Sequence, residues 1–593
     1  MKKKLHTNCS NINPEVYLGN NRLNIGNGPT KTGDNSRFLF VNSFFIAVAF
    51  LGLTSCRSTD TDNNLNNGGV AQVAFNLTGT DFAEQNRSPQ PSASLKTGAA
   101  FSSNGNSGSV IQQKTIMLSP SSFIQAELAP AENNNLGTAK VNALAAVNSG
   151  SAGGAIASAP GASLTSGMKF RIIAYKAADG TYVTHKDYTV GQPADGLILE
   201  QGTQYTFVAY SFGSTSALPT ITSGETTNLS SAQVAYDNTN RDFMYQKMDY
   251  TPSQASQAVP FTLRHKLTQM TVTINSYSST PITAIGTMLI NPHYSSGTFP
   301  LSTGNMINRG ASSSNQTLSL ATTLPAVSIT TNPIILNADT SGALTGNFQA
   351  TNITINGETN TINPLNAFKI TPETNSTLTI NLKRCGAYIG PNTNPANFKE
   401  FACQNLGATA GIDPFSPVAG NHGLKVQWGR NITGTNGQYY YTQASDQSNS
   451  GTITGWSTTN AADGAWNSGT EASPIKTAND PCPSGYRVPT NTEWQAVINN
   501  NTNIERVGTW ADNGNYTTAL YFRNPSNVRT LMLPAAGYRY YTDGTLSYRG
   551  NSGRYWSSSV TSSNAYNLHF DSSSVYVNNY RRTNGMSVRC IAE

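Results

Sequence analysis

Residues 169–175 read KFRIIAY and residues 205–210 read YTFVAY, and these two short runs decide the fold of the first half of the chain. Apolar side chains recur at every second position, so that Phe170, Ile172 and Ala174 share one face of the first run. A period of two residues is typical of a β-strand. Both runs are therefore predicted to be half-buried strands of a β-sandwich.

The alternation extends over residues 261–274, FTLRHKLTQMTVTI. Its apolar phase slips by one residue between Leu267 and Met270, and a β-bulge near Thr268 would absorb the slip. A weaker alternation continues as far as Leu382. We therefore expect two β domains, a first at residues 70–275 and a smaller one at residues 276–384.

The composition favours a mostly β protein. Hydrophobic residues make up 37% and charged residues 11% of the 593 residues, and much of the remainder is Gly, Ser, Thr and Asn, which favour strands and turns over helices. All six tryptophans lie after residue 384. A different fold is therefore predicted for residues 385–593.

The N-terminal region predicts export and lipidation. Residues 38–53 form an apolar run behind a basic stretch, short for a membrane span but suited to a signal peptide. The sequence LTSC that ends at Cys56 matches a lipobox, so cleavage would leave Cys56 carrying diacylglycerol and an acyl chain such as palmitate. We predict a signal segment at residues 1–55 and a lipidated tether at residues 56–69. An uncleaved membrane helix is the alternative.

The charge distribution argues against a nucleic-acid partner. Six basic and two acidic residues precede Cys56, so their removal lowers the net charge from +6 to +2. A near-neutral chain without clusters of Lys and Arg lacks the electrostatic footprint that phosphate binding needs. We expect the lipid chains to hold the protein at the cell outer membrane, exposed at the cell surface or within a fimbria.

Four cysteines remain after Cys9 and Cys56 are set aside. In an oxidising compartment an even number of cysteines most simply forms disulfides, although four allow three pairings. We favour one disulfide between Cys385 and Cys403 and another between Cys482 and Cys590.

Three segments in the first half resemble the fimbrillin family, the two-domain β-sandwich pilins and anchors of Bacteroidetes type V pili. They are GMKFRIIAYKAADGTYVTHKDYTV, LILEQGTQYTFVAYSF and FTLRHKLTQMTVTI, and the resemblance covers about residues 70–380. It implies a fimbrial or adhesive role and assembly with other subunits by donor-strand exchange. In that family a protease specific for basic sites removes the first strand, and Arg87 and Lys96 are the candidate processing sites here.

The last third resembles the Fibrobacter succinogenes major paralogous domain. The segments that carry the resemblance occur in order: EFACQNLGA, HGLKVQWGR, PCPSGYRVPTNTEWQAV, PAAGYRYYTDG, RYWSSS and GMSVRCI. The resemblance implies an extracellular module with a mixed α+β, C-type-lectin-like fold similar to that of the sulfatase-modifying enzymes. The whole chain is then two fimbrillin-like β-sandwich domains followed by a lectin-like head.

The segment RVPTNTEW allows a catalytic and a structural interpretation. Glu493 and Trp494 could act as an acid and a stacking residue, by analogy with the sulfatase-modifying enzymes. The structural interpretation, which we favour, is the start of a helix with Thr490 or Thr492 at the capping position.

No other pattern in the sequence points to an enzyme or a cofactor. There is no nucleophile elbow, phosphate loop or zinc-binding helix, and the six histidines are scattered. The calcium- and sugar-binding tripeptides of true C-type lectins are also absent. We therefore predict a protein that is not an enzyme and binds no metal or cofactor.

The candidate binding residues are aromatic and arginine side chains in the last third. Tyr and Trp supply rigid contact area and Arg supplies forked hydrogen bonds in binding sites. They are Tyr538, Tyr540, Tyr541, Arg549, Tyr555 and Trp556. The alternative is that Tyr555 and Trp556 pack in the core.

These observations predict an adhesive surface protein whose head binds a glycan or a protein on a host or bacterial surface. One alternative is a structural pilus subunit or anchor that binds no ligand. A second is an accessory protein of carbohydrate processing, which would need a catalytic pair that the sequence does not offer.

Overall fold

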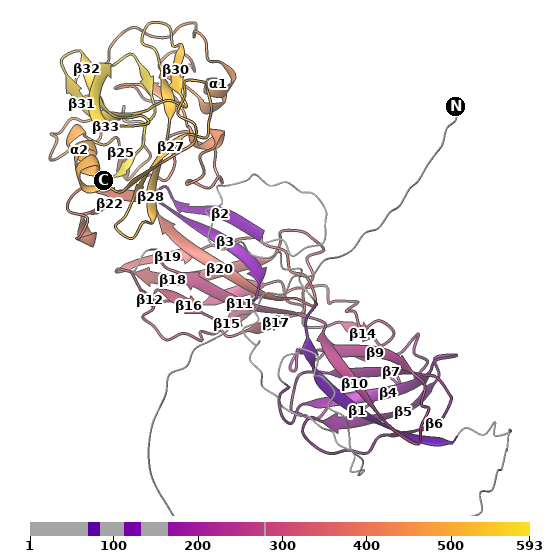
Figure 1. Ribbon diagram of the computed structural model, residues 1–593. Helices are drawn as coiled ribbons and strands as arrows, with labels where there is room; N and C mark the ends of the chain where they lie inside the picture. The colour runs from indigo at the N-terminus through magenta and orange to yellow at the C-terminus, as the bar shows by residue number, and fades with distance from the viewer. Residues whose placement is uncertain (1–68, 84–111, 132–163, 278–279) are drawn as a thin grey trace, which may run out of the picture. The chain divides into compact units, whose positions relative to one another are not determined.

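The structure is a computed structural model that describes residues 69–83, 112–131, 164–277 and 280–593 (Figure 1). The described part is mostly β, as the sequence predicted, and it contains two short α-helices. Three of the predicted sites, Cys56, Arg87 and Lys96, lie outside the described residues.

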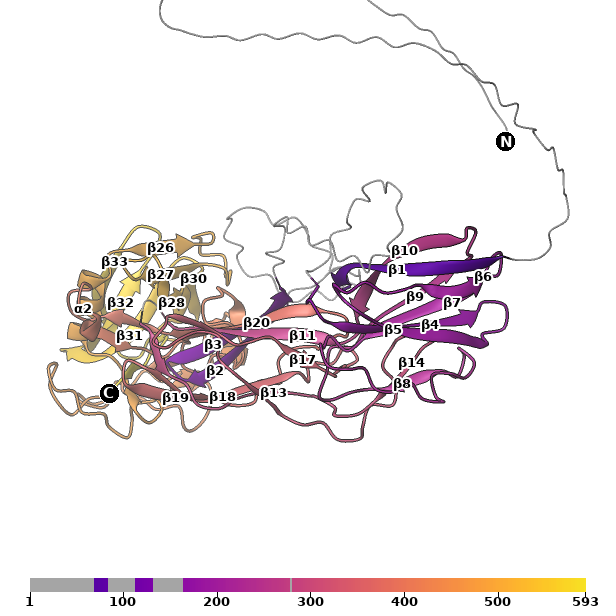
Figure 2. The ribbon, with the colours of Figure 1, turned by 90° about the horizontal axis from the view of Figure 1, so that it is seen from below.

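The first sheet has seven strands in the order β5-β4-β7-β9-β10-β1-β6. Its strands are β1 (Val70–Asp81), β4 (Lys169–Lys176), β5 (Tyr182–Thr189), β6 (Leu197–Glu200), β7 (Tyr205–Ser211), β9 (Met244–Tyr250) and β10 (Ser256–His265). The strand β1 runs parallel to β10 and antiparallel to β6, and Figure 2 shows it beside β10. The first strand therefore lies inside the sheet, between two others.

Both faces of this sheet are buried at β4 and β7. On β4, Phe170, Ile172 and Ala174 contribute to one apolar cluster, as predicted, but Ile173 and Tyr175 contribute to a second cluster on the opposite face. The prediction of half-buried strands is therefore wrong for these two. The alternate positions are themselves apolar or aromatic, which is typical of strands buried on both sides.

The shift in apolar phase after Leu267 is a passage between two sheets and not a β-bulge. The strand β10 ends at His265 in the first sheet, and β11 (Thr268–Asn275) pairs with β20 (Asn375–Arg384) in another. Two residues between strands of different sheets reset which side faces a core. The chain therefore passes from one sheet to the other here, about ten residues before the domain boundary expected at residue 275.

The second sandwich consists of two sheets. One has the order β16-β11-β20-β3-β2, with β17 also paired to β11, and the other has the order β12-β18-β13-β15, with β19 paired to β18. The remaining strands are β2 (Gln112–Ser119), β3 (Ser122–Pro130), β12 (Ile282–Ala284), β13 (Met288–Asn291), β15 (Gln316–Leu318), β16 (Ser328–Thr330), β17 (Ile334–Leu336), β18 (Asn347–Ile355) and β19 (Glu358–Ile362). A separate two-stranded ladder joins β8 (Gln233–Ala235) to β14 (Thr298–Pro300).

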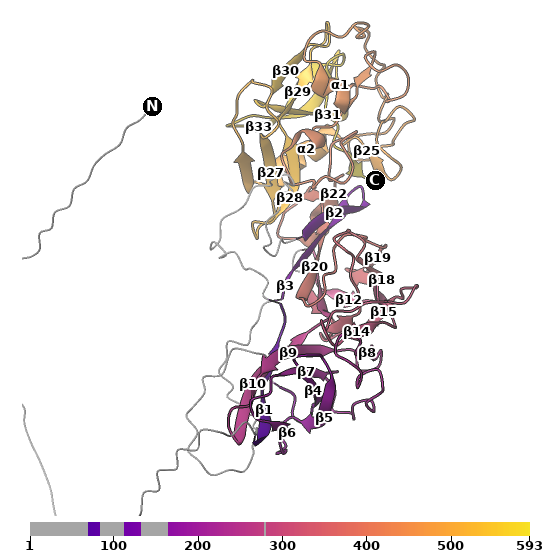
Figure 3. The same cartoon turned by 90° about the vertical axis from the view of Figure 1, so that its right-hand side faces the viewer.

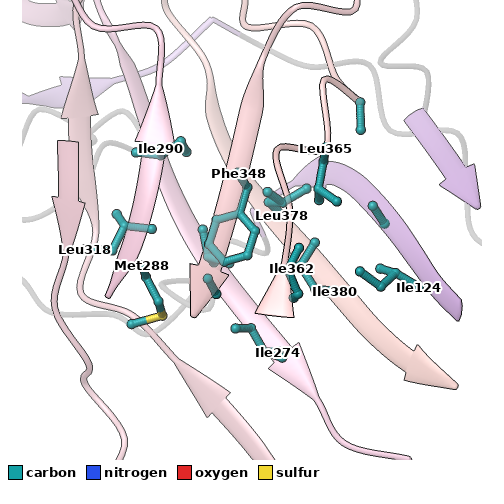
Figure 4. Packing of buried hydrophobic residues seen from close by; sticks show 14 of the residues in the cluster. Ile124, Ile274, Met288, Ile290, Leu318, Phe348, Ile362, Leu365, Leu378 and Ile380 are labelled. Atoms are coloured by element: carbon teal, nitrogen blue, oxygen red, sulfur yellow. The ribbon is translucent and has the colours of Figure 1, made fainter. Parts of the chain in front are cut away.

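The sequence placed β2 and β3 in the first domain, whereas they complete a sheet of the second. Side chains from β3, β11 and β20 meet those of β13 and β18 in a single apolar core (Figure 4). Ile124, Ile274 and Ile380 come from the sheet that contains β11, and Met288 and Phe348 come from the sheet that contains β18. This sandwich is therefore built from segments of the chain about 250 residues apart.

The C-terminal domain, residues 385–593, combines four sheets with the helices α1 (Gln443–Ser448) and α2 (Asn491–Asn500). The largest sheet contains β23 (Lys425–Gln427), β24 (Tyr440–Tyr441), β29 (Ala536–Arg539), β30 (Leu546–Arg549), β31 (Gly553–Thr561), β32 (Asn564–Phe570), β33 (Val575–Arg581) and β34 (Gly585–Met586). The smaller ones pair β21 (Gly386–Tyr388) with β22 (Phe398–Glu400), β25 (Tyr486–Arg487) with β35 (Ile591–Ala592), and β27 (Ala519–Arg523) with β26 (Ile504–Val507) and β28 (Arg529–Pro534). Two 3-10 turns occur at Pro395–Asn397 and Ala419–Asn421.

Four buried tryptophans stabilise the core of this domain. Trp428, Trp466, Trp494 and Trp556 are fully buried. Each indole N–H donates to a backbone carbonyl, for example from Trp556 to Val426 at 2.8 Å and from Trp494 to Trp556 at 3.2 Å. Such bonds satisfy the only polar atom of each buried ring, so these rings stabilise the domain without an unpaired donor.

The helix α2 begins as the structural interpretation predicted. Thr490 caps it by accepting the Glu493 N–H, and the Glu493 carboxylate accepts the Thr490 N–H at 2.8 Å, which completes a capping box. The same carboxylate accepts two hydrogen bonds from the Arg487 guanidinium, at 2.7 and 2.5 Å. Both oxygens of the Glu493 carboxylate accept hydrogen bonds from these groups, so Glu493 has a structural role in this domain.

Both favoured disulfides are present. Cys385 is bonded to Cys403, 18 residues away, and Cys482 is bonded to Cys590, 108 residues away. In the chain-entropy account the longer closure stabilises the domain by about 4 to 5 kcal/mol, because it restricts the unfolded chain most.

We predict that Glu493→Gln lowers the free energy of unfolding of the C-terminal domain by about 2 kcal/mol, because it weakens charge-assisted hydrogen bonds to Arg487. Urea unfolding followed by tryptophan fluorescence measures this domain alone, since all six tryptophans lie in it. The control Gln495→Ala, on the exposed face of α2, should change stability by less than about 0.5 kcal/mol. Equal stability of the Glu493 variant and wild type would contradict the structural role.

Candidate functional site

A group of tyrosine and arginine side chains lies together in the C-terminal domain, carried by β29 and the residues just after it and by β30, β31 and β33. These four strands are labelled in Figure 3. We call this group the tyrosine–arginine surface, and it consists of Tyr538, Tyr540, Tyr541, Tyr548, Arg554, Tyr580 and Arg581. Their side chains meet although β32 lies between β31 and β33 in the sheet and up to 43 positions separate them in the sequence.

Arg554 is the centre of this surface. Its guanidinium carbon lies 4.0 Å from the ring centroid of Tyr538 and 4.3 Å from that of Tyr580. The ring of Tyr548 lies 5.3 Å from the same carbon and stacks on Tyr538 at an interplanar angle of 11°. One cation held between three rings fixes the orientation of all three. The result is a rigid aromatic platform.

The outer edge of the surface is accessible to solvent. Tyr548 is 42% exposed and Tyr540 is 37% exposed. The rings of Tyr540 and Tyr541 lie 4.5 Å apart, and the Arg581 guanidinium lies 4.4 Å above the ring of Tyr541. These side chains offer ring faces, phenol hydroxyls and a guanidinium to a partner, which are the groups that dominate contact energy in many interfaces.

Three of the predicted binding residues do not belong to this surface. Tyr555 and Trp556 are fully buried, where Tyr555 donates to the Pro534 carbonyl and Trp556 to that of Val426. Arg549 is 5% exposed and points to a buried carboxylate. We assign structural roles to all three. Tyr555 and Trp556 lie on β31, which is covered on both faces, so alternation there does not separate surface from core, and Arg549 at the end of β30 is drawn inward by Asp446.

A buried charge cluster, which the sequence analysis missed, lies beside the tyrosine–arginine surface. Asp446 on α1 is its only carboxylate, and it accepts a 2.8 Å hydrogen bond from Arg539. Two more cations lie close to the same carboxylate, Arg549 at 3.5 Å and Lys425 at 3.7 Å. All four residues are at most 5% exposed. Local sequence gives no sign of this cluster, because its members come from four separate elements.

The charges in this cluster alter one another's protonation. Burial opposes ionisation of Asp446, but the three surrounding cations hold its pKa below the usual value. Burial lowers the pKa of Lys425 to about 8 although Asp446 opposes the change, and the ammonium makes no hydrogen bond in the described part of the chain. Burial also lowers the pKa of His422 to about 3, which keeps it neutral. The cluster is closed to solvent, so we assign it a structural role.

Comparison with protein families identifies two regions of the chain. Residues 157–396 match the family described as fimbrillin-like, and residues 409–592 match the Fibrobacter succinogenes major domain. The chain joins a fimbrillin-like region to a Fibrobacter succinogenes major domain. Both resemblances inferred from the sequence are therefore confirmed. A comparison with curated proteins finds no match.

Solved structures similar to this chain include proteins described as cell adhesion, fimbrial anchor and fimbrial assembly proteins. A candidate cell adhesion protein of Bacteroides fragilis is 12% identical with a TM-score of 0.29, over 53% of this chain and 93% of that one. The fimbrial anchor protein Mfa2 of Porphyromonas gingivalis is 13% identical with a TM-score of 0.22, over 32% and 71%. A fimbrial assembly protein of Parabacteroides distasonis is 10% identical with a TM-score of 0.24, over 37% and 88%. At such values the likeness carries no conclusion about function.

Two further features bear on the chemistry of the fimbrillin-like region and the major domain. Among the residues that the structure describes, no group of three His, Cys, Asp or Glu side chains is arranged to hold a metal ion. Within the same ranges no helix is long and apolar enough to cross a membrane. Its exposed tyrosine rings and guanidinium make the tyrosine–arginine surface of the major domain our candidate functional site.

We predict that Lys425→Met leaves the stability of the major domain unchanged or raises it by up to about 2 kcal/mol, because Asp446 keeps both arginines and a costly buried charge is removed. In wild type the unfolded state holds more protons on Lys425 than the folded state between about pH 8 and 10.5. Unfolding free energy should therefore rise with pH across this window, and the variant should lack that rise.

Urea unfolding at pH 8, 9 and 10, followed by tryptophan fluorescence, measures both effects. The matched variant Arg539→Met should instead lose about 3 to 5 kcal/mol, because it removes the closest partner of Asp446. A Lys425→Met protein destabilised as strongly as Arg539→Met would refute this account.

Proposed function

We propose that this chain is a lipid-anchored surface adhesin in which the fimbrillin-like region carries a lectin-like major domain that binds a glycan or a cell-surface protein. The observation that supports the proposal most is the tyrosine–arginine surface. Rigid tyrosine rings lose little conformational entropy on binding, and arginine adds directional hydrogen bonds. A surface of this composition is suited to adhesion.

Fixed geometry distinguishes this surface from scattered surface aromatics. Arg554 is 5% exposed and is enclosed by Tyr538, Tyr548 and Tyr580, so the platform is ordered before a ligand arrives. An interface that is ordered in advance binds more tightly because less entropy is lost on association. Adhesion involves binding without chemical turnover, so an ordered binding surface is sufficient for it.

A structural pilus subunit or anchor is the main alternative, and the fimbrillin-like region favours it. In this alternative the major domain extends the subunit and has no ligand. An accessory role in carbohydrate processing finds less support, because the acidic residue that could have served it, Glu493, is held by Arg487 and Thr490.

The anchor of the proposed adhesin is Cys56. Its lipid chains would hold the protein at the outer membrane, with residues 57–69 as a polar tether ahead of β1. Two or more acyl chains are needed for stable attachment, and the lipobox cysteine would carry them.

The proposed contact with other fimbrial subunits is exchange of β1. This strand lies between β10 and β6, and Phe75 packs in the core with its centroid 4.9 Å from that of Phe207 and 6.4 Å from that of Phe261. Cleavage at Arg87 or Lys96 would separate β1, together with the Cys56 tether, from the residues that follow it. A strand from another subunit could then replace it and recover both ladders.

We predict that the double variant Tyr540→Ala, Tyr541→Ala of the full chain weakens attachment at least about tenfold, because it removes two adjacent rings at the accessible edge of the tyrosine–arginine surface. Glycan-array binding and attachment of cells displaying the protein are the measurements. Ile475→Ala, at another exposed apolar position of the major domain, should bind like wild type.

Two results would separate the rival functions. Equal attachment by wild type and the double variant would favour the structural pilus subunit. Cys56→Ala should leave binding by the purified protein intact but abolish palmitate labelling and release the protein from the membrane fraction, whereas labelling that persists would refute the anchor.

We predict that limited digestion with trypsin cuts after Arg87 or Lys96, frees β1 and lets the protein form oligomers by strand exchange. The double variant Arg87→Ala, Lys96→Ala should stay monomeric under the same conditions. Size-exclusion chromatography with light scattering measures both outcomes. Cleaved protein that keeps β1 bound and remains monomeric would refute exchange of this strand.

A further inference from the structure

The major domain contains a hollow that shares no residue with the tyrosine–arginine surface. It has a volume of about 410 Å³, and its polar lining comes from Arg430, Asn431, Thr433, Tyr439, Asn460 and Asn479. This volume lies within the range of pockets that hold small ligands. Three separate loops contribute to it, so the fold of the domain brings these side chains together.

Small residues keep the hollow open. Gly429, Ala461 and Ala465 form part of its wall. Gly429 has a φ of 75°, and a β-carbon added there would lie 2.5 Å from that of Ala461. A larger residue at position 429 would therefore both strain the backbone and fill the space.

Arg430 is held in a defined position at this hollow. Its carbonyl accepts the indole N–H of Trp466 at 3.0 Å, which fixes the backbone. Its guanidinium lies 4.3 Å from the ring centroid of Tyr439 and donates through Nη2 to the Thr459 carbonyl at 3.1 Å. The cation is thus oriented before any ligand binds, which lowers the entropy lost on association.

The guanidinium of Arg430 is nonetheless incompletely satisfied. Its Nε is buried and has no hydrogen-bond partner within the described residues, and no ion pair of Arg430 occurs in that part of the chain. The adjacent acidic residues are engaged elsewhere. Asp463 pairs with Arg582 at 2.5 Å, and Asp480 accepts the backbone N–H of Val488 at 2.8 Å. The Nη1 of Arg430 also donates no hydrogen bond within the described residues but is not closed to solvent, so a carboxylate in the hollow could accept from it.

We propose that this hollow binds an acidic sugar, a uronic or sialic acid, with its carboxylate on Arg430. Guanidinium and carboxylate form paired, charge-assisted hydrogen bonds. Asn460 and Asn479 are exposed at the rim and make no side-chain hydrogen bond within the described residues. Each offers both a donor and an acceptor to sugar hydroxyls. The single cation and the surrounding amides fit a polyhydroxylated monoanion better than a phosphate, which carries more charge.

The test measures binding to the full chain by isothermal titration calorimetry. The probes are methyl β-D-glucuronide, N-acetylneuraminic acid, methyl β-D-glucoside and inorganic phosphate. At least one acidic sugar should bind, while the glucoside and phosphate should bind at least about tenfold more weakly. Arg430→Gln should weaken binding of the acidic sugar by at least about tenfold. The double variant Asn460→Ala, Asn479→Ala changes only exposed side chains and should weaken it by a smaller factor.

The Tyr540→Ala, Tyr541→Ala protein is the matched control, and it should bind the acidic sugars like wild type. Binding lost in this control but kept in Arg430→Gln would overturn the hollow as the site. So would equal binding of glucuronide and glucoside, stronger binding of phosphate, or no binding of any probe. If Arg430→Gln fails to fold, as tryptophan fluorescence would reveal, the asparagine variant decides.

Discussion

One continuous segment, from β10 into β11, supplies an inner strand to two different sheets, and the rest of the described fold depends on this constraint. In the first sheet β10 lies between β9 and β1, and in the second β11 lies between β20 and the short strands β16 and β17. Only Lys266 and Leu267 separate β10 from β11. When one of these strands pairs in its sheet, the position of the other strand is therefore restricted to within two residues. Both cores are therefore coupled through a two-residue passage.

The same pattern continues into the major domain. The strand β20 pairs with β11 and β3, and the chain then enters the C-terminal sheets at Cys385, whose N–H donates to the Ser121 carbonyl at 2.7 Å. Within that domain the buried indoles donate to backbone carbonyls, and the cations of the Asp446 cluster surround one carboxylate. The side chains that remain accessible, on the tyrosine–arginine surface and around Arg430, are the ones free to meet a partner.

Much of the fold could be predicted from local sequence because side-chain alternation and helix capping are local effects. Phe170, Ile172 and Ala174 do share a face, Thr490 does cap a helix, and both favoured disulfides form. Alternation does not reveal which sheet a strand joins, so the positions of β2, β3 and β11 were not predictable. Alternation also does not show whether a tyrosine or arginine side chain is buried, because the apolar part of either can pack in the core while its polar end forms a hydrogen bond. The candidate binding residues were therefore divided between surface and core.

The Cys385–Cys403 disulfide has a mechanical consequence. It closes the segment that holds β21 and β22 at the place where β20 passes into the major domain. When one end of a chain is fixed and a force acts on the domain at its other end, the tension follows the shortest covalent route between the two points. That route passes through the sulfur atoms and bypasses the closed loop, which therefore contributes no extension and keeps its hairpin folded under force. The covalent path from β20 into the major domain is shorter by this loop, so the junction extends less under load than it would without the disulfide.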